Sequence, residues 1–297
     1  MLDLIIAGSG PAGLSAAVYA SNAMLDFVVI EKFPMSGGQI LNSCDINNYL
    51  GFELADGFTL GQTFRKHAEK SGAQFVNDEI TAIEKIDGGY KVVCNNNEFE
   101  TKTIIYALGA NPRKLGAKGE LDLMGKGVSY CATCDGNFFR KKPAAVVGGG
   151  DVALEDALYL ANICSEVYLI HRRDELRGAK YLQDKVFNND KIKLVLNAQV
   201  EEIIGENKVE SVRLNNGETL NVDGVFIAVG TEANSKLVEG LVDTDRGFIV
   251  ADESGKTSAE GIFAAGDVRT KRLRQISTAV ADGANAVYSA EEFLNII

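Results

Sequence analysis

The sequence is poor in histidine and proline and has no long apolar run. Its 297 residues include two histidines and four prolines. No apolar run reaches the ~18 residues that a membrane-spanning helix needs, so no membrane partner is expected. Lysine and arginine number 30 against 41 acidic residues, a net charge of −11. This acidity argues against nucleic acid or an anionic membrane as the main partner.

The N-terminal segment lacks the basic residues that begin a signal peptide. The first basic residue is Lys32, and a glycine-rich turn interrupts the apolar stretch before it. This pattern predicts a strand, a turn and a helix, so the expected location is the cytoplasm. The chain is long for one compact core, and two domains are expected.

Cysteine is too scarce for a fold held together by disulfides. Five cysteines is an odd count in a large chain, and Cys44, Cys94 and Cys164 are isolated from one another. The other two, Cys131 and Cys134, are separated by two residues. They therefore form the one cysteine motif of the sequence.

The Cys131 and Cys134 pair fits half of a zinc site, a redox dithiol or a coincidence. A structural zinc site needs four ligands, and the sequence has no second pair. His67 lies in a polar helical stretch and His171 in a predicted strand, so a redox dithiol is favoured and no metal is expected. Asp135 follows directly; it could deliver a proton to a departing thiolate, or it could simply form a turn before Gly136.

An internal repeat organises the chain. The segment "LDLIIAGSGPAGLSAAVYA" followed by "FVVIEK" matches the design of "AAVVGGGDVALEDALYLA" followed by "VYLIHRR". Each predicts an apolar strand, a glycine-rich turn, a helix and a second buried strand. Two such units predict an α/β fold with two Rossmann-like dinucleotide-binding domains.

The small residues of the two turns have separate tasks. The first permits the tight bend, the second lets the backbone approach a pyrophosphate, and the third lets the helix pack close to its strand. In the first turn these residues are Gly8, Gly10 and Gly13, and in the second they are Gly148, Gly150 and Ala153.

The end of the second strand distinguishes the two sites. Glu31 and His171 occupy equivalent places in the repeat. Glu31 offers a carboxylate to ribose hydroxyls. His171 is followed by Arg172, Arg173 and Arg177, whose guanidinium groups suit a 2′-phosphate and hence NADPH. The alternative is a solvated helix start of mixed charge.

Other segments complete the expected fold. "TIIYALG", "GVFIAVG" and "GIFAAGD" predict further apolar strands. The alternating stretch 191–223 predicts an antiparallel hairpin packed beside the second unit. The last segment, 274–297, has apolar residues at helical spacing and predicts a closing helix.

The motifs "GSGPAGLSAAVYA", "GGQI", "GVSYCATCDG", "VVGGGDVALEDALYLA", "LIHRRDELR", "FAAGDVR" and "RQISTAVADGA" occur in that order. Together they resemble the low-molecular-weight thioredoxin reductase family along nearly the whole chain. The resemblance implies a flavoprotein, usually a homodimer. Such an enzyme passes electrons from NADPH through FAD to the cysteine pair, and then to thioredoxin.

The resemblance also assigns roles to residues. Cys134 is expected to meet the flavin, Cys131 to attack the thioredoxin disulfide, and Asp135 to donate a proton. The residues expected to hold FAD are Gly8, Gly10, Pro11, Ala12, Gly13, Glu31, Gly38, Gln39, Asn48, Gly109, Asp267, Arg274 and Gln275. Those expected to hold NADPH are Gly148, Gly150, Asp151, Val152, Ala153, His171, Arg172, Arg173 and Arg177.

The cysteine pair and the NADPH turn are expected to share one domain, 116–242, inserted into an FAD domain formed by 1–115 and 243–297. A dithiol and a nicotinamide must both reach the flavin, and one rigid domain is not expected to present both in one orientation. The inserted domain is therefore expected to rotate between two poses. Both crossing segments contain glycine and polar residues, which suits a hinge.

The sequence departs from the family pattern at four places, Leu50, Leu108, Asn137 and Val152. The family usually has two aromatic residues after "CDG" that form a pocket for an aromatic side chain of thioredoxin. Asn137 replaces the first of them, so the partner is expected to be thioredoxin or a thioredoxin-like protein. Two alternatives stay open: a flavin disulfide reductase with another donor such as reduced ferredoxin, and a flavin-bearing redox sensor without turnover.

Overall fold

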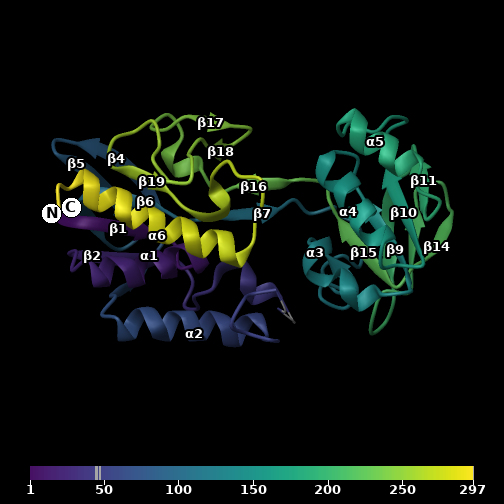
Figure 1. The fold of residues 1–297 in the computed structure, drawn as a ribbon, viewed down its shortest axis with the longest axis horizontal. Coiled ribbons are helices and arrows are strands. Elements are labelled where there is room, and N and C mark those ends of the chain that lie inside the picture. The colour runs from purple at the N-terminus through teal and green to yellow at the C-terminus, as the bar shows by residue number, and fades with distance from the viewer. Residues whose placement is uncertain (44–45, 47, 297) are drawn as a thin grey trace. The chain divides into compact units, whose positions relative to one another are not determined.

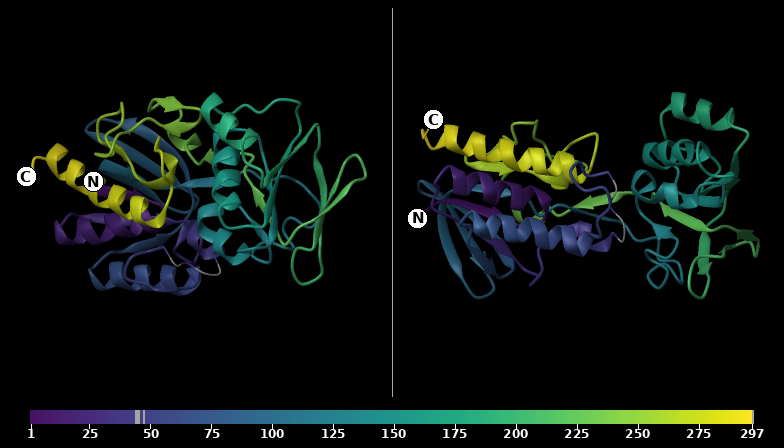
Figure 2. Two further views of the ribbon diagram at one scale, coloured as in Figure 1. Left: turned by 45° about the vertical axis from the view of Figure 1, so that its right-hand side comes forward. Right: turned by 60° about the horizontal axis from the view of Figure 1, so that its bottom comes forward.

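A computed structural model describes residues 1–43, 46 and 48–296, shown in Figures 1 and 2. Cys44, expected to be an isolated cysteine, lies outside the described residues. The chain divides into two compact units. The first, here called the terminal unit, comprises Met1–Asn111 and Glu232–Ile297; the second, the inserted unit, comprises Pro112–Thr231.

The terminal unit contains a seven-stranded sheet in the order β3-β2-β1-β6-β5-β4, with β19 beside β6. The parallel strands are β1 (Leu2–Ala7), β2 (Phe27–Glu31), β3 (Phe75–Asn77), β6 (Glu98–Tyr106) and β19 (Ile262–Ala264). The strands β4 (Ile80–Ile86) and β5 (Gly89–Cys94) form an antiparallel hairpin on β6. This topology confirms the α/β class expected from the repeat.

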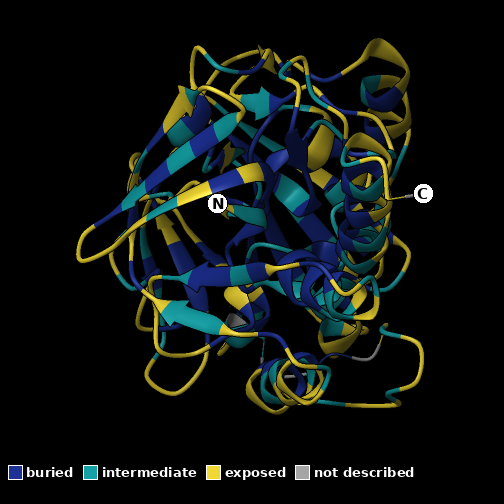
Figure 3. Cartoon of the chain, turned by 90° about the vertical axis from the view of Figure 1, so that its left-hand side faces the viewer, coloured by how far each residue is buried: buried dark blue, intermediate teal, exposed yellow. Residues whose placement is uncertain are grey.

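Helices α1 (Pro11–Asn22) and α6 (Ile276–Phe293) lie side by side on one face of this sheet (Figure 1). Small residues let them approach: a Cβ atom on Gly283 would lie 2.1 Å from the carbonyl oxygen of Ala12. Helix α2 (Gly57–Lys70) begins after Asp56, whose side chain accepts a hydrogen bond from the Thr59 N–H. Figure 3 shows that buried positions gather in the interior, whereas the outer sides of the helices are exposed.

The inserted unit contains a parallel sheet in the order β11-β10-β9-β15-β8. Its strands are β8 (Val128–Ser129), β9 (Pro143–Val147), β10 (Glu166–His171), β11 (Ile192–Leu196) and β15 (Gly224–Ile227). Its helices are α3 (Ala132–Asp135), η2 (Gly136–Phe139), α4 (Asp151–Ala161) and α5 (Lys180–Phe187). The second half of the repeat therefore forms the expected strand, turn, helix and strand.

The alternating stretch 191–223 is not one antiparallel element. Its first strand, β11, runs parallel to β10. Helix α5 carries the chain back to the end of the sheet at which β10 begins, so both strands run in the same direction. The antiparallel part is the sheet of β12 (Val200–Ile204), β13 (Ser211–Leu214) and β14 (Thr219–Asn221). Its Val200 and Val212 belong to the same buried hydrophobic cluster as Val147 of the parallel sheet.

The chain crosses between the units in two segments that pair with each other, β7 (Ala110–Pro112) and β16 (Thr231–Ala233). The expected boundaries after 115 and 242 lie four and eleven residues beyond the observed ones. The larger difference has a packing cause. Val238, in η3 (Lys236–Val238), and Val242 are buried in the core of the terminal unit.

Three further short elements complete the terminal unit. They are the hairpin of β17 (Thr244–Asp245) and β18 (Phe248–Ile249), the turn η1 (Gly38–Asn42) and the turn η4 (Gly266–Val268). None of the helices in the described part of the chain is long and apolar enough to cross a membrane. Within that same part, no three metal-ligating side chains gather into a possible metal site.

Candidate functional site

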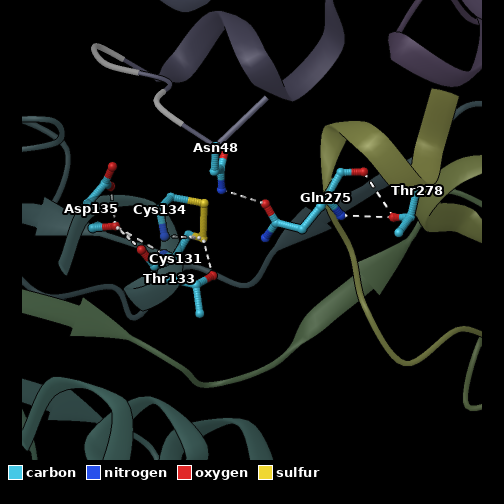
Figure 4. Close-up of a disulfide and its surroundings, with 8 residues drawn as sticks. Asn48, Cys131, Thr133, Cys134, Asp135, Gln275 and Thr278 are labelled. Carbon is cyan, nitrogen blue, oxygen red and sulfur yellow. Dashed lines mark hydrogen bonds between the residues drawn. A yellow bond between two sulfur atoms is a disulfide. The ribbon is translucent and has the colours of Figure 1, made fainter. Parts of the chain in front are cut away.

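Cys131 and Cys134 form a disulfide, with their Cα atoms 5.3 Å apart (Figure 4). Cys131 precedes the short helix α3 as its N-cap, so the Cys134 N–H donates to Cys131 Sγ at 3.2 Å. Both cysteines are half-buried, whereas Thr133 between them is exposed, its Oγ1 3.5 Å from Cys131 Sγ. The local helical turn thus brings the sulfur atoms together and leaves one side of the pair accessible.

Ser129, at the end of β8, links the disulfide to the neighbouring carboxylate. Its buried hydroxyl donates to Asp135 Oδ2 at 2.5 Å and accepts from the Cys131 N–H at 3.0 Å. The acid is thereby held beside the cysteine pair, where it can take up or release a proton. Ser129 is not among the residues predicted from the sequence; its position two residues before Cys131 is the one signal that could have indicated it.

A buried carboxylate, Glu120, ties this region to the chain that follows the crossing segment β7. Glu120 is 3% exposed and accepts hydrogen bonds from the Leu115 N–H at 2.8 Å, the Gly116 N–H at 2.7 Å and the Tyr130 hydroxyl at 2.6 Å. Burial and the Glu120 carboxylate raise the pKa of Tyr130. The residue preceding Cys131 is therefore anchored to the end of the crossing segment, which the sequence analysis did not foresee.

The first glycine turn has the shape that the sequence predicts. Gly8 adopts a φ of 98°, and a Cβ atom on Gly13 would lie 1.9 Å from the Gly8 carbonyl oxygen, so no side chain fits there. A Cβ atom on Gly10 would meet nothing within 4 Å, so this backbone is open. Pro11 occupies the first helical position, and Ala12 is buried behind it.

Two loops are brought to this turn. The Gly37 N–H donates to the Ser9 carbonyl oxygen at 2.9 Å, and a Cβ atom on Gly38 would lie 3.3 Å from Gly10 Cα. Gln39 follows Gly38 and is exposed. Gly109, with a φ of 66°, comes just after Leu108, whose side chain lies against Gly8.

Glu31, at the end of β2, lies against the first glycine turn. Its Oε2 accepts from both the N–H and the hydroxyl of Ser9, at 2.9 and 2.8 Å, and its Oε1 accepts from the Phe33 N–H at 3.1 Å. Ser9 thus fixes the carboxylate beside the glycine turn. It is a second contributor that the sequence analysis missed.

Asp267, in η4, carries an unusual buried oxygen. Its Oδ1 is one of two buried side-chain atoms without a hydrogen-bond partner in the described part of the chain. Burial raises the pKa of Asp267, although Lys271 and Arg274 lie close enough to oppose that shift. An unpaired buried oxygen of this kind is expected to bond a ligand hydroxyl.

Arg274 and Gln275 lie at the start of α6. The Arg274 guanidinium stacks over the Phe248 ring, 4.2 Å from its centroid, and burial lowers its pKa. Gln275 forms a capping box with Thr278 and accepts a hydrogen bond from Asn48 Nδ2 at 3.0 Å (Figure 4). The structure therefore brings Asn48 to the beginning of this helix.

A buried cluster of charges holds η4 against α6. This cluster was not predicted from the sequence. Asp282 is 5% exposed and accepts from the Gly266 N–H at 2.9 Å, from Arg269 NH2 at 2.6 Å and from Lys271 Nζ at 2.7 Å. The N–H adjacent to Asp267 is thereby fixed by a side chain from the next helix. Buried charges of this kind are stable when they are paired and hydrogen-bonded.

His171 lies directly over the second glycine turn. A Cβ atom on Gly149 would lie 2.4 Å from the ring atoms Cε1 and Nδ1, so Gly149 must lack a side chain, a requirement the sequence analysis overlooked. The ring is 5% exposed and its Nε2 has no partner among the described residues. Burial is the main cause that lowers the pKa of His171, and the positive charges of Arg177, Arg173 and Arg172 lower it further.

The three arginines gather around this histidine. All are exposed, and none forms a salt bridge to an acid in the part of the chain that the structure describes. The N–H groups of Arg177 and Gly178 donate to the Gly149 carbonyl oxygen at 2.6 and 3.1 Å. Guanidinium groups without an acidic partner, held next to a glycine turn, have the chemistry that suits a phosphate group.

The remaining residues of the second turn are placed close by. Gly148 packs against the Ala228 carbonyl oxygen, Gly150 is open, and Ala153 is fully buried. Asp151 Oδ1 accepts from the Ala179 N–H at 2.7 Å, so this acid also fastens the arginine loop to the start of α4. Val152 is 60% exposed.

The sequence and fold match those of known proteins. The model of the pyridine nucleotide-disulphide oxidoreductase family matches residues 2–283. Thioredoxin reductases of Peptoclostridium acidaminophilum and Bacillus subtilis are 43% and 44% identical, over 98% of this chain and 96% and 94% of theirs. The solved thioredoxin reductase of Streptococcus pyogenes is 41% identical, with a TM-score of 0.94 over 100% of this chain and 99% of its own.

Proposed function

The chain belongs to the thioredoxin reductases of the pyridine nucleotide-disulphide oxidoreductase family, and from this premise we propose its reaction in detail. Electrons pass from NADPH through FAD to the Cys131–Cys134 disulfide, and then to the disulfide of thioredoxin or a thioredoxin-like protein. The proposal rests on the presence, in one chain, of two glycine turns, an arginine cluster at the second turn, and a disulfide.

The terminal unit has the residues to hold FAD. The open backbone at Gly10 and the loop at Gly38 suit a pyrophosphate, and Glu31 suits ribose hydroxyls. The unpaired Oδ1 of Asp267 suits a further hydroxyl, such as one on ribitol. Bound there, the flavin supplies a carrier that accepts two electrons and passes them to a disulfide.

The inserted unit has the residues to hold NADPH. The unpaired Nε2 of His171 and the guanidinium groups of Arg172, Arg173 and Arg177 surround the place where a 2′-phosphate would lie. No acid in the described part of the chain forms a salt bridge with these arginines. This supports NADPH as donor over NADH, and over reduced ferredoxin, which would have no use for such a site.

The cysteine pair exchanges electrons with the protein substrate. Two electrons and two protons convert the Cys131–Cys134 disulfide into two thiols. The Cys131 thiolate then attacks one sulfur of the substrate disulfide, forming a mixed disulfide and releasing a thiolate, which takes a proton. Cys134 attacks the Cys131 sulfur, so the internal disulfide reforms and the substrate leaves as a dithiol, with Asp135 as the nearby proton carrier.

Ser129 is expected to position Asp135 for these proton transfers. Ser129→Ala should lower kcat for thioredoxin reduction roughly tenfold, because a hydrogen bond to a charged group contributes about 1.5–3 kcal/mol. Ser129→Thr, which keeps the hydroxyl, should restore most of the rate. The measurement is kcat against pH for both variants. Ser211→Ala, at another buried serine of the same unit, is the matched control, and equal rates for Ala and Thr at position 129 would contradict the role.

The inserted unit is proposed to rotate during turnover, since its NADPH site and its disulfide must reach the flavin in turn. The support is the pair of crossing segments, flanked by glycines with positive φ: Gly109 at 66° and Gly116 at 83° on either side of β7, and Gly230 at 114° directly before β16. A Cβ atom on Gly109 or Gly116 would meet nothing within 4 Å, and one on Gly230 would make only an ordinary contact with Arg113 Cδ at 3.7 Å, so packing does not explain these glycines. Such residues absorb large backbone changes at a hinge.

Tethering tests the rotation. A disulfide engineered between the two units should stop steady-state turnover while FAD stays bound, because one of the two electron transfers is then blocked. The measurement compares NADPH consumption with flavin absorbance in the tethered protein. The two single-cysteine variants serve as controls. Undiminished turnover after complete tethering would rule the rotation out.

The reaction is tested by an anaerobic titration of the flavin. NADPH should bleach the yellow flavin at far lower concentration than NADH, and oxidised thioredoxin should restore the colour. If reduced ferredoxin bleaches the flavin and neither nucleotide does, then the electron donor is ferredoxin and not NADPH. Reduction without any turnover on thioredoxin would favour a redox sensor.

Two further points rest on the family. A homodimer is proposed, to be tested by sedimentation of the FAD-loaded protein. The cytoplasm is proposed as the location, because NADPH is supplied there and the free cysteines Cys94 and Cys164 are buried as thiols rather than paired.

A further inference from the structure

A short segment directly after the disulfide helix is held rigidly. Gly136 at the start of η2 is seated against α4, since a Cβ atom there would lie 3.0 Å from side-chain atoms of Leu160 and Tyr159. Phe139 turns inward and makes an edge-to-face contact with Phe226, with ring centroids 5.3 Å apart. The turn carrying residues 136–139 is therefore fixed to the body of the inserted unit.

The next residues are fixed by their backbone. Lys141 adopts a left-handed φ of 60°, which is costly for a side chain larger than glycine. Its N–H donates to the Ile163 carbonyl oxygen at 2.8 Å, and the Lys142 carbonyl oxygen accepts from the Ser165 N–H at 3.1 Å. A strained conformation that the surroundings enforce in this way commonly marks a functional segment.

This rigid segment presents a basic surface in an acidic protein. The basic surface consists of Asn137, Phe138, Arg140, Lys141 and Lys142, all of them exposed. It carries three positive charges and no negative one, although the whole chain has a net charge of −11. Within the described residues none of its three cations forms a salt bridge, and Lys142 Nζ donates instead to the Phe138 carbonyl oxygen at 3.3 Å.

The surface does not have the pair of exposed aromatic rings that the family resemblance implies. Asn137 occupies the first aromatic place and Phe139 is packed against Phe226, so Phe138, 46% exposed, is the ring left outside. A partner that docks on this surface would therefore meet one apolar ring and three cations. Electrostatic complementarity raises association rates and selects partners, whereas single exposed charges add little to affinity.

We propose that the basic surface docks a thioredoxin-like protein with aspartate or glutamate side chains beside its own disulfide. This inference rests on the proposed thioredoxin reductase activity and names the partner's chemistry. The charge sign follows from three cations that have no acidic partner among the described residues, and the location follows from the sequence, because the surface begins at Asn137, three residues after Cys134. The electrostatic attraction between the basic surface and the partner acts before the mixed disulfide forms. It does not alter the thiol–disulfide exchange itself.

The test reverses the charge of this surface. The readout is kcat/KM for an acidic thioredoxin, divided by kcat/KM for the neutral 2-hydroxyethyl disulfide, with NADPH as donor. In the variant carrying Lys141→Glu and Lys142→Glu this ratio should fall about 10- to 100-fold at low salt, because steering of this kind changes association rates by 10–10³. The loss should appear in KM rather than kcat and should shrink as salt is added.

The matched control carries Lys180→Glu and Lys185→Glu on α5, which changes the charge of the same unit by the same amount. Its ratio should stay unchanged. A thioredoxin whose acidic side chains near the disulfide are replaced by lysine should be reduced better by the reversed variant than by the original protein. An unchanged ratio for the reversed variant would overturn the docking proposal, whereas an original protein that reduces 2-hydroxyethyl disulfide but no thioredoxin would overturn the proposed function instead.

Discussion

Replacing Cys134 with serine should lower kcat/KM for NADPH-dependent thioredoxin reduction by about a thousandfold or more. The internal disulfide can then no longer form, so the chain loses its electron carrier between flavin and substrate. Losses of this size are typical when a residue that forms a covalent bond in the reaction is removed. The measurement is steady-state thioredoxin reduction at saturating NADPH, with the flavin content of the variant determined in parallel.

The matched control for this prediction is Cys164→Ala. Cys164 is a buried free thiol in the same unit, so its removal tests whether the loss of any cysteine suffices. A modest loss of stability is expected there, together with nearly full activity. The Cys134→Ser protein should also retain Cys131 as a free thiol that forms a covalent complex with oxidised thioredoxin. Retention of more than a few per cent of the original activity would contradict the dithiol mechanism.

Replacing Arg173 and Arg177 with alanine should remove most of the preference for NADPH over NADH. Each guanidinium group is exposed, close enough to lower the pKa of His171, and free of acidic partners in the described residues. Hydrogen bonds to charged groups contribute about 1.5–3 kcal/mol each. The ratio of kcat/KM for NADPH to that for NADH should therefore fall roughly 10²- to 10³-fold, through the NADPH value alone.

Lys180→Ala provides the control for the cofactor prediction. Lys180 is a cation of the same unit that pairs with Asp184 on α5, so its loss changes the charge of the unit without touching the arginine cluster. Its nucleotide preference should stay that of the original protein. A double arginine variant that still prefers NADPH by the original ratio would place the 2′-phosphate elsewhere.

The main features of the site follow from local sequence patterns. The turns at Gly8 and Gly148 follow from strand and helix periodicity around fixed glycine spacings. The redox dithiol follows from Cys131 and Cys134 together with the scarcity of other metal ligands. These features depend on residues close together in the chain, whose geometry the peptide backbone largely dictates.

Other features required the tertiary structure. The contact of His171 with Gly149 and the anchoring of Gly266 by Asp282 join residues from different elements. The clamp between Glu120 and Tyr130 depends on a loop folding back onto the end of a short strand. Periodicity carries no information about such contacts, because they depend on which elements the core brings side by side.

The limits of the inserted unit show the same division. Composition suggested a boundary near 242, in a polar segment with glycine, but Val238 and Val242 are buried in the terminal unit and move the boundary to 231. The basic surface was equally hidden: the sequence gives its lysines, but the inward turn of Phe139 decides which side chains face solvent. The sequence by itself determined the chemistry and both nucleotide turns, since these are local. The tertiary structure decided the boundary, the anchoring of the site and the face offered to a partner, because those follow from burial of side chains distant in sequence.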